Sequence, residues 1–169
     1  DTTDVSTDDG AHQVIVEGLD SNWDIAQEAV LTNGQTAAIT VSPFYAVNGI
    51  SIVDAGVDGT NKGVIYAGSG AVSSGVPATK YSVIDQAKGI SQVINFTVPR
   101  NHTLEIESVT LMPKTVGVTS FEWRIERNQI VETQTVSQTI VNLVYRDPAQ
   151  SYTEFKRPIV FNPRENFMM

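Results

Sequence analysis

Apolar and polar residues alternate along most of the chain, which is the period of half-buried β-strands. In the first half this pattern predicts strands over residues 13–17, 46–54 and 63–67. Glycine-rich stretches at residues 56–63 and 68–75 separate these strands from their neighbours and predict turns. The N-terminal half is therefore expected to be a series of short strands joined by glycine-rich loops.

The dipeptide Asn33-Gly34 is the strongest hairpin signal in the sequence. An Asn-Gly pair readily adopts the positive φ angles that a two-residue turn requires. It stands between two strand-like stretches, residues 28–32 and 36–41, so these are predicted to pair with each other. The apolar residues of the second stretch share one face: Ala37, Ile39 and Val41.

The second half has the clearer alternation and predicts five more strands. They cover residues 94–98, 104–111, 121–126, 134–145 and 155–161. In the first of them Ile94, Phe96 and Val98 form the apolar face, and Pro99 ends the ladder. In the third, Phe121, Trp123 and Ile125 form a dry face opposite charged residues.

Two of these strands change the parity of their apolar residues. The change falls near Ser108 in one strand and at Ile140–Val141 in the other. A one-residue slip of this kind is what a β-bulge produces, because a bulge places two residues opposite one. The sequence thus predicts irregular strand pairing at two defined positions.

Nine to eleven short strands separated by turns predict an all-β fold, an antiparallel β-sandwich or jelly roll. Val, Ile and Thr supply 53 of the 169 residues and Leu only five, a composition that favours strands. A short helix after Ser21, with Trp23, Ala26 and Val30 on one side, is a minor alternative. The expected organisation is an acidic segment over residues 1–12 followed by one β-sandwich domain over residues 13–169.

The formal charge of −8 is unevenly distributed, since residues 1–99 carry all of it and residues 100–169 are neutral. An acidic chain without a cluster of Lys or Arg argues against nucleic acid and against anionic membranes as partners. No stretch has the length of a membrane-spanning helix, and no signal sequence opens the chain. The absence of cysteine excludes disulfides, and both ends of the chain are expected to be cuts through a longer polypeptide.

Few residues have the chemistry of a catalytic site. The two histidines are His12 and His102, and no Gly-x-Ser-x-Gly motif is present. A Ser-His-Asp arrangement stays open, because its members meet only in the fold. His102 is interpreted as a solvated turn residue. Glu105 and Glu107 share one face of a strand, where a wet surface is favoured over a pair of catalytic carboxylates.

The stretch from Asp20 to Asp24 places oxygen-bearing side chains at every second position, as a calcium loop does. Ile25 and Leu31 then stand where such a loop needs glycine and glutamate. A turn whose carboxylates bond to their own backbone is the favoured interpretation. A calcium ion shared with Asp4, Asp8 or Asp9 is the alternative.

Aromatic residues could form a sugar-stacking platform, but core packing or subunit contact is favoured. The residues concerned are scattered along the chain: Trp23, Tyr45, Tyr66, Tyr81, Trp123, Tyr145 and Tyr152. The sequence therefore assigns no catalytic, cofactor-binding or metal-binding residue, and it predicts a protein that is not an enzyme.

Several short motifs resemble a family of structural proteins of marine bacteriophages. The motifs are Gly-Leu-Asp-Ser-Asn-Trp at residues 18–23, Glu-Ala-Val-Leu-Thr-Asn-Gly at 28–34, the Thr-rich stretch 36–41, Asn-Lys-Gly-Val-Ile at 61–65 and Phe-Thr-Val-Pro at 96–99. They occur in the family's order over most of residues 1–112, and more faintly from Arg157 onward. The stretch from Pro99 to Thr103 departs from the family's glycine-containing turn.

The resemblance implies a non-enzymatic virion protein that is assembled in the bacterial cytoplasm and contacts other proteins, with homo-oligomers expected. A capsid-associated decoration, cement or head-fibre component bound to the major capsid protein is the first hypothesis. A tail, neck or fibre component that binds receptor glycans is the second. A glycan-depolymerase domain is the third.

Overall fold

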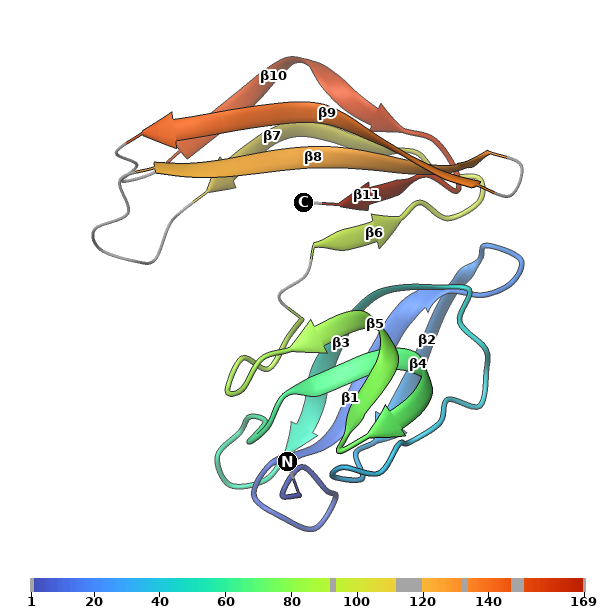
Figure 1. Ribbon diagram of the computed structural model, residues 1–169, viewed down its shortest axis with the longest axis vertical. Helices are drawn as coiled ribbons and strands as arrows, with labels where there is room; N and C mark the ends of the chain where they lie inside the picture. Colours follow the sequence, from blue (N-terminus) through green and yellow to red (C-terminus); the bar gives the residue numbers. More distant parts are fainter. Residues whose placement is uncertain (1, 92–93, 112–119, 132–133, 147–150, 169) are drawn as a thin grey trace. The chain divides into compact units, whose positions relative to one another are not determined.

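The computed structural model describes residues 2–91, 94–111, 120–131, 134–146 and 151–168 (Figure 1). The protein is all-β: 58% of it is strand, arranged in several antiparallel sheets. The described residues form eleven strands and no helix, and so no helix that could cross a membrane. The predicted all-β class is confirmed, and eleven strands lie at the upper end of the predicted nine to eleven.

The chain forms two compact units, Asp1–Thr97 and Val98–Met169. The sequence predicts one domain over residues 13–169 instead. The strongly acidic part of the sequence coincides with the first unit, because residues 98 and 99 are uncharged and the charge of −8 therefore lies within Asp1–Thr97. Each unit is described by itself below.

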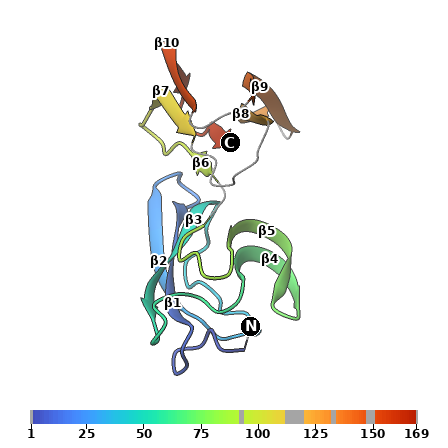
Figure 2. The same cartoon turned by 90° about the vertical axis from the view of Figure 1, so that its left-hand side faces the viewer.

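The first unit contains a three-stranded antiparallel sheet in the order β2-β1-β3. Its strands are β1 (Ala11–Leu19), β2 (Ile25–Leu31) and β3 (Ala46–Ala55). A second, two-stranded sheet is the hairpin of β4 (Ile65–Ser73) and β5 (Val76–Ile84). Figure 2 shows this hairpin facing the three-stranded sheet, so that the unit has two layers.

Apolar residues from both layers make the core of the first unit. Val14 and Val16 of β1, Ile50 of β3 and Ile84 of β5 are buried in one cluster. Val14 and Val16 are two residues apart, so they share the inner face of the sheet. Val30 of β2 packs against the same cluster. The strand predicted over residues 13–17 is confirmed within β1.

The second unit combines two further groups of antiparallel strands. One is the pair β7 (Leu104–Leu111) and β10 (Ser151–Phe161), and the other has the order β11-β8-β9. The members of the latter are β8 (Ser120–Val131), β9 (Gln134–Arg146) and β11 (Asn166–Met168). A separate core joins these groups through Val98, Ile125, Phe161 and Phe167. The rings of Phe161 and Phe167 meet edge to face at 5.4 Å.

Of the two predicted bulges in the second unit, the one at Ile140–Val141 is confirmed, and the one-residue bulge predicted in the strand around Ser108 is wrong. Ile125 pairs with Val141 but Glu126 pairs with Thr139, which leaves Ile140 as the extra residue of β9. Ile140 and Val141 both pack against the core, as their adjacent apolar side chains require. Near Ser108 the register of β7 also shifts, and the extra residues belong to the partner strand β10.

The hairpin predicted around Asn33-Gly34 is wrong. The turn forms, since Gly34 has a φ of 58° and the amide of Thr36 donates to the carbonyl of Asn33. The residues after it form no strand, and Ile39 and Val41 are 85% and 93% exposed. Strand β2 instead pairs with β1 through the tight turn that precedes it. That turn takes the place of the alternative helix after Ser21.

The glycine-rich stretch 68–75 is also not a loop, because β4 continues through it to Ser73. A side chain at Gly68 would lie 2.1 Å from the carbonyl oxygen of Thr79, so the close approach of β5 requires glycine there. The partner strand β5 and the short β11 were not predicted. In β6 (Asn95–Thr97) the predicted apolar face is wrong at Phe96, which is exposed while Thr97 is buried, although Val98 after the strand is buried as predicted.

Segment 1–12 belongs to the first unit instead of preceding it. Val5 forms an isolated bridge with Asn33, the amide of Gly10 donates to the carbonyl of Thr3, and β1 already begins at Ala11. A local contact accounts for this placement. Asp4 is buried and supplies the acceptors that hold the segment in place.

Candidate functional site

The first unit has a partly open cavity of about 550 Å³ between its two layers. Core residues Val14, Val16 and Ile50 line it from the three-stranded sheet. Tyr66 and Ser69 of β4 and Tyr81 of β5 line it from the hairpin, and residues 32–40 run along it. The volume is in the range of small-molecule sites, and most of the lining is apolar.

On the side of the cavity formed by the β4–β5 hairpin, the lining includes hydroxyl groups. The Oγ of Ser69 and the hydroxyl of Tyr81 are hydrogen-bonded at 2.8 Å, and the Nζ of Lys80 lies 5.8 Å from the centre of the Tyr66 ring. Tyr81 is partly exposed. This arrangement could contact the apolar face of a ring-shaped ligand and bond to its hydroxyls.

Asp4 is the carboxylic acid of the cavity lining, and both of its oxygens are occupied. Oδ1 accepts hydrogen bonds from the amides of Ala11 at 2.9 Å and Lys62 at 2.8 Å, and Oδ2 accepts one from Gly63 at 2.7 Å. A carboxylate with three backbone donors is fixed in position. The Asp4 carboxylate therefore connects the N-terminal segment to Lys62 and Gly63. Because its oxygens already accept hydrogen bonds, it is poorly placed to act as a general base.

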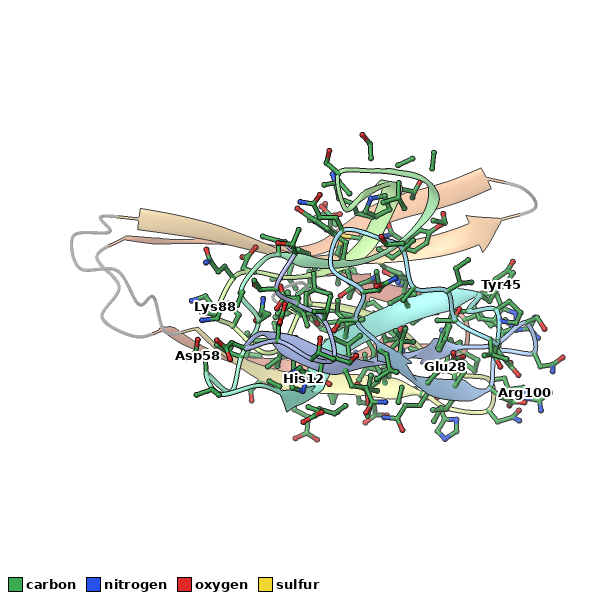
Figure 3. All side chains as sticks on the ribbon, turned by 90° about the horizontal axis from the view of Figure 1, so that it is seen from below. His12, Glu28, Tyr45, Asp58, Lys88 and Arg100 are labelled. Carbon is green, nitrogen blue, oxygen red and sulfur yellow. The ribbon has the colours of Figure 1, made fainter. Side chains whose placement is uncertain are left out.

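Glu28 holds the loop that follows the Asn33-Gly34 turn. Its two carboxylate oxygens accept hydrogen bonds from the amides of Val41 at 2.7 Å and Ser42 at 3.0 Å. Figure 3 shows Glu28 and Tyr45 toward one end of the three-stranded sheet, while His12 lies toward the other. These two hydrogen bonds, hereafter the Glu28 clamp, fix the C-terminal end of residues 36–41, hereafter the 36–41 segment. The side chains of Ile39 and Val41 in this segment are exposed to solvent.

The 36–41 segment is not part of any strand. Among the described residues, the peptide groups of Ala37 to Thr40 have no hydrogen-bond partner, and residues 36–40 line the cavity. The outer face of the neighbouring β2 is also apolar at its two ends, Ile25 and Leu31. Large apolar side chains exposed to solvent occur on surfaces that bind other proteins.

Trp23 and Tyr45 form an aromatic pair at the turn between β1 and β2. Their ring centres are 4.8 Å apart, and Tyr45 donates its amide to the carbonyl of Leu19. Trp23 has a φ of 66°, which is unusual for a bulky residue. Of the other aromatic residues considered, Trp123, Tyr145 and Tyr152 have side chains outside the described residues.

The turn from Asp20 to Asp24 bonds to its own backbone, as predicted. The Oδ1 of Asp20 accepts hydrogen bonds from the amides of Asn22 at 2.8 Å and Asp24 at 3.0 Å. Within the described ranges, no three His, Cys, Asp or Glu side chains are grouped as metal ligands. Asp4, the alternative calcium ligand named from the sequence, accepts hydrogen bonds from backbone amides instead.

His102 lies in an exposed turn, as the sequence predicts. Its Nδ1 lies 2.9 Å from the carbonyl oxygen of Arg100, and its amide donates to Pro99. Glu105 and Glu107 are both exposed on β7, so the wet-surface interpretation is confirmed.

His12 links the N-terminal segment to β3. Its Nε2 lies 2.5 Å from the carbonyl oxygen of Asp8, and its Nδ1 lies 3.3 Å from the Oδ2 of Asp54. The hydrogen bond to the Asp8 backbone raises the pKa of His12 above its ordinary value of 6.5. The Asp54 carboxylate adds to this effect and desolvation opposes it.

Sequence reasoning named Asp4 only as an alternative calcium ligand and did not single out Glu28, although these two carboxylates shape the site. Both bond to backbone amides far along the chain, and such contacts leave no local pattern. The chain matches no protein-family model, no curated protein and no solved structure. The function is therefore argued from the residues of the site itself.

Proposed function

We propose that the protein is a non-enzymatic structural component of a bacteriophage particle, bound to the capsid as a decoration, cement or head-fibre protein. The observation that carries this proposal is the exposure of large apolar side chains in the first unit, namely Ile39 and Val41 of the 36–41 segment and Ile25 and Leu31 of β2. Such side chains lose unfavourable contact with water when another protein covers them. The bacteriophage particle enters the proposal because of the sequence resemblance to phage structural proteins.

The construction of both units suits a shell component. Each is a small β module, interpreted as a sandwich or jelly-roll-like arrangement, with bulged strands and its own core. The first unit carries the full charge of −8, so it would face solvent or a basic surface of the major capsid protein. Several copies on a symmetric shell would gain avidity that one weak contact lacks.

A tail, neck or fibre component that binds glycans is the second candidate. The cavity favours it, because Tyr66 and Tyr81 line the cavity together with the hydroxyl of Ser69. A glycan depolymerase would need two or three carboxylates converging on a groove. Asp4, the carboxylate of this cavity, has both oxygens occupied by backbone amides, which counts against that third candidate.

Electron cryomicroscopy of the intact particle, combined with mass spectrometry of its proteins, tests the proposal. We expect density for the two β units repeated over the icosahedral shell in contact with the major capsid protein. Density confined to the tail would overturn the capsid assignment in favour of the glycan-binding alternative, and a glycan array would follow. Absence of the chain from purified particles would overturn both virion assignments.

A further inference from the structure

The 36–41 segment has the sequence of a β-strand but lacks a strand partner. Ala37, Ile39 and Val41 alternate with Thr36, Ala38 and Thr40, a pattern that elsewhere in this chain marks paired strands. In the structure the peptide groups of residues 37–40 are unpaired among the described residues, and Ile39 and Val41 are almost fully exposed. Such an edge is a template for pairing with another chain.

The charge distribution indicates which chain would pair with it. No charged residue occurs between Glu28 and Asp54, although the first unit as a whole carries −8. A basic partner therefore has nothing to recognise on the segment itself. A second copy of the segment brings no like charges face to face, which would be destabilising in a strand pair.

We propose that the 36–41 segments of two copies of this chain pair as antiparallel strands about a two-fold axis. The proposal rests on the structural role proposed above, for which it names an assembly surface. With Ile39 opposite Ile39, residues 37 and 41 also face each other, so the large apolar side chains of both strands, Ile39 and Val41, fall on one side. The contact is self-complementary, as a two-fold interface must be.

The clamp by Glu28 is consistent with this register. If the Ile39 pair is a non-hydrogen-bonded pair, Ala38 and Thr40 of the two copies exchange the ladder hydrogen bonds. The amide of Val41 then points away from the partner, where it already donates to Glu28. The next hydrogen bonds of the ladder would involve the amide of Ser42. This amide already donates to the Glu28 carboxylate, so the ladder cannot extend past this position.

A cysteine variant of the full chain tests the pairing, because the natural chain contains no cysteine. In a non-hydrogen-bonded antiparallel pair the Cα atoms are about 4.5 Å apart, a separation that a disulfide can bridge. Under mild oxidation Ile39→Cys is expected to form a covalent dimer about tenfold faster than Val57→Cys, a ratio worth about 1.4 kcal/mol. Val57 is a matched control, since it is 90% exposed but lies on a different loop.

Sedimentation equilibrium of the unmodified chain supplies a second readout. We expect a concentration-dependent dimer that Ile39→Lys weakens by about tenfold or more, because it places two like charges opposite each other. Val57→Lys should leave the dimer unchanged. Equal oxidation rates for the two cysteine variants, or a monomer at every concentration, would overturn the pairing. Binding of the same samples to intact particles is measured separately, so a failure here is distinguishable from failure of the virion assignment.

Discussion

At the scale of single residues, Asp4 has the largest structural role in the first unit. Its carboxylate accepts hydrogen bonds from Ala11, Lys62 and Gly63. We expect Asp4→Ala to lower the free energy of unfolding of this unit by about 3 kcal/mol, because buried backbone donors lose their acceptor. Urea denaturation measures the change. Asp9→Ala removes an exposed carboxylate instead, and an equal loss from that control would contradict the role of Asp4.

His12 makes the attachment of the N-terminal segment depend on pH. Its pKa is raised in the folded protein, so its protonated form stabilises the fold. This contribution is fully present below the unfolded pKa of 6.5 and is lost as the pH rises through the folded value. We expect the melting temperature difference between the natural protein and His12→Gln to be larger at about pH 5.5 than at about pH 8.5. A difference independent of pH would contradict this linkage.

At the scale of elements, Glu28 decides the conformation of the loop after β2. Replacing it with Gln removes the negative charge that strengthens its bonds to the amides of Val41 and Ser42. We expect hydrogen exchange of these two amides to accelerate by about tenfold in monomeric samples. Glu17→Gln is the matched control, since Glu17 accepts its hydrogen bond from the side chain of Gln27. Unchanged exchange in Glu28→Gln would show that other contacts hold the loop.

The outcome for individual strands shows what a local pattern can predict. Ile140 and Val141 are adjacent apolar residues in an alternating strand, and only a bulge brings both to the core. That signal is entirely local, so the sequence contains it. The Asn33-Gly34 turn was equally local and correct, but the choice of β1 as the partner of β2 depends on competing pairings. Local alternation does not decide between such partners.

The same distinction applies to the candidate site. The turn at Asp20 was predictable, because its carboxylate bonds to amides within four residues. The contact between Asp4 and Gly63 spans 59 residues, and the contact between Glu28 and Val41 spans 13. The cavity lies between two layers, one of which includes the unpredicted β5. The site is therefore a property of the assembled unit, and the sequence shows only its separate parts.

At the scale of the whole molecule, the two units have separate cores. Ile84 belongs to the core of the first and Ile125 to the core of the second, and both side chains are fully buried. Removing such a side chain costs about 3 kcal/mol, because it loses burial and leaves a cavity. If each core unfolds cooperatively by itself, each substitution lowers the free energy of unfolding only of the unit that contains it.

We therefore expect calorimetry of the full chain to resolve two thermal transitions. Ile84→Ala should lower the temperature of one transition and Ile125→Ala that of the other, which assigns each transition to its unit. Two conservative variants, Ile84→Val and Ile125→Val, should produce the same pattern with smaller shifts, since they remove only one methyl group. A single transition that both alanine variants lower equally would mean that the chain unfolds as one cooperative domain. Separate transitions would agree with the charge distribution, in which an acidic unit is joined to a neutral one.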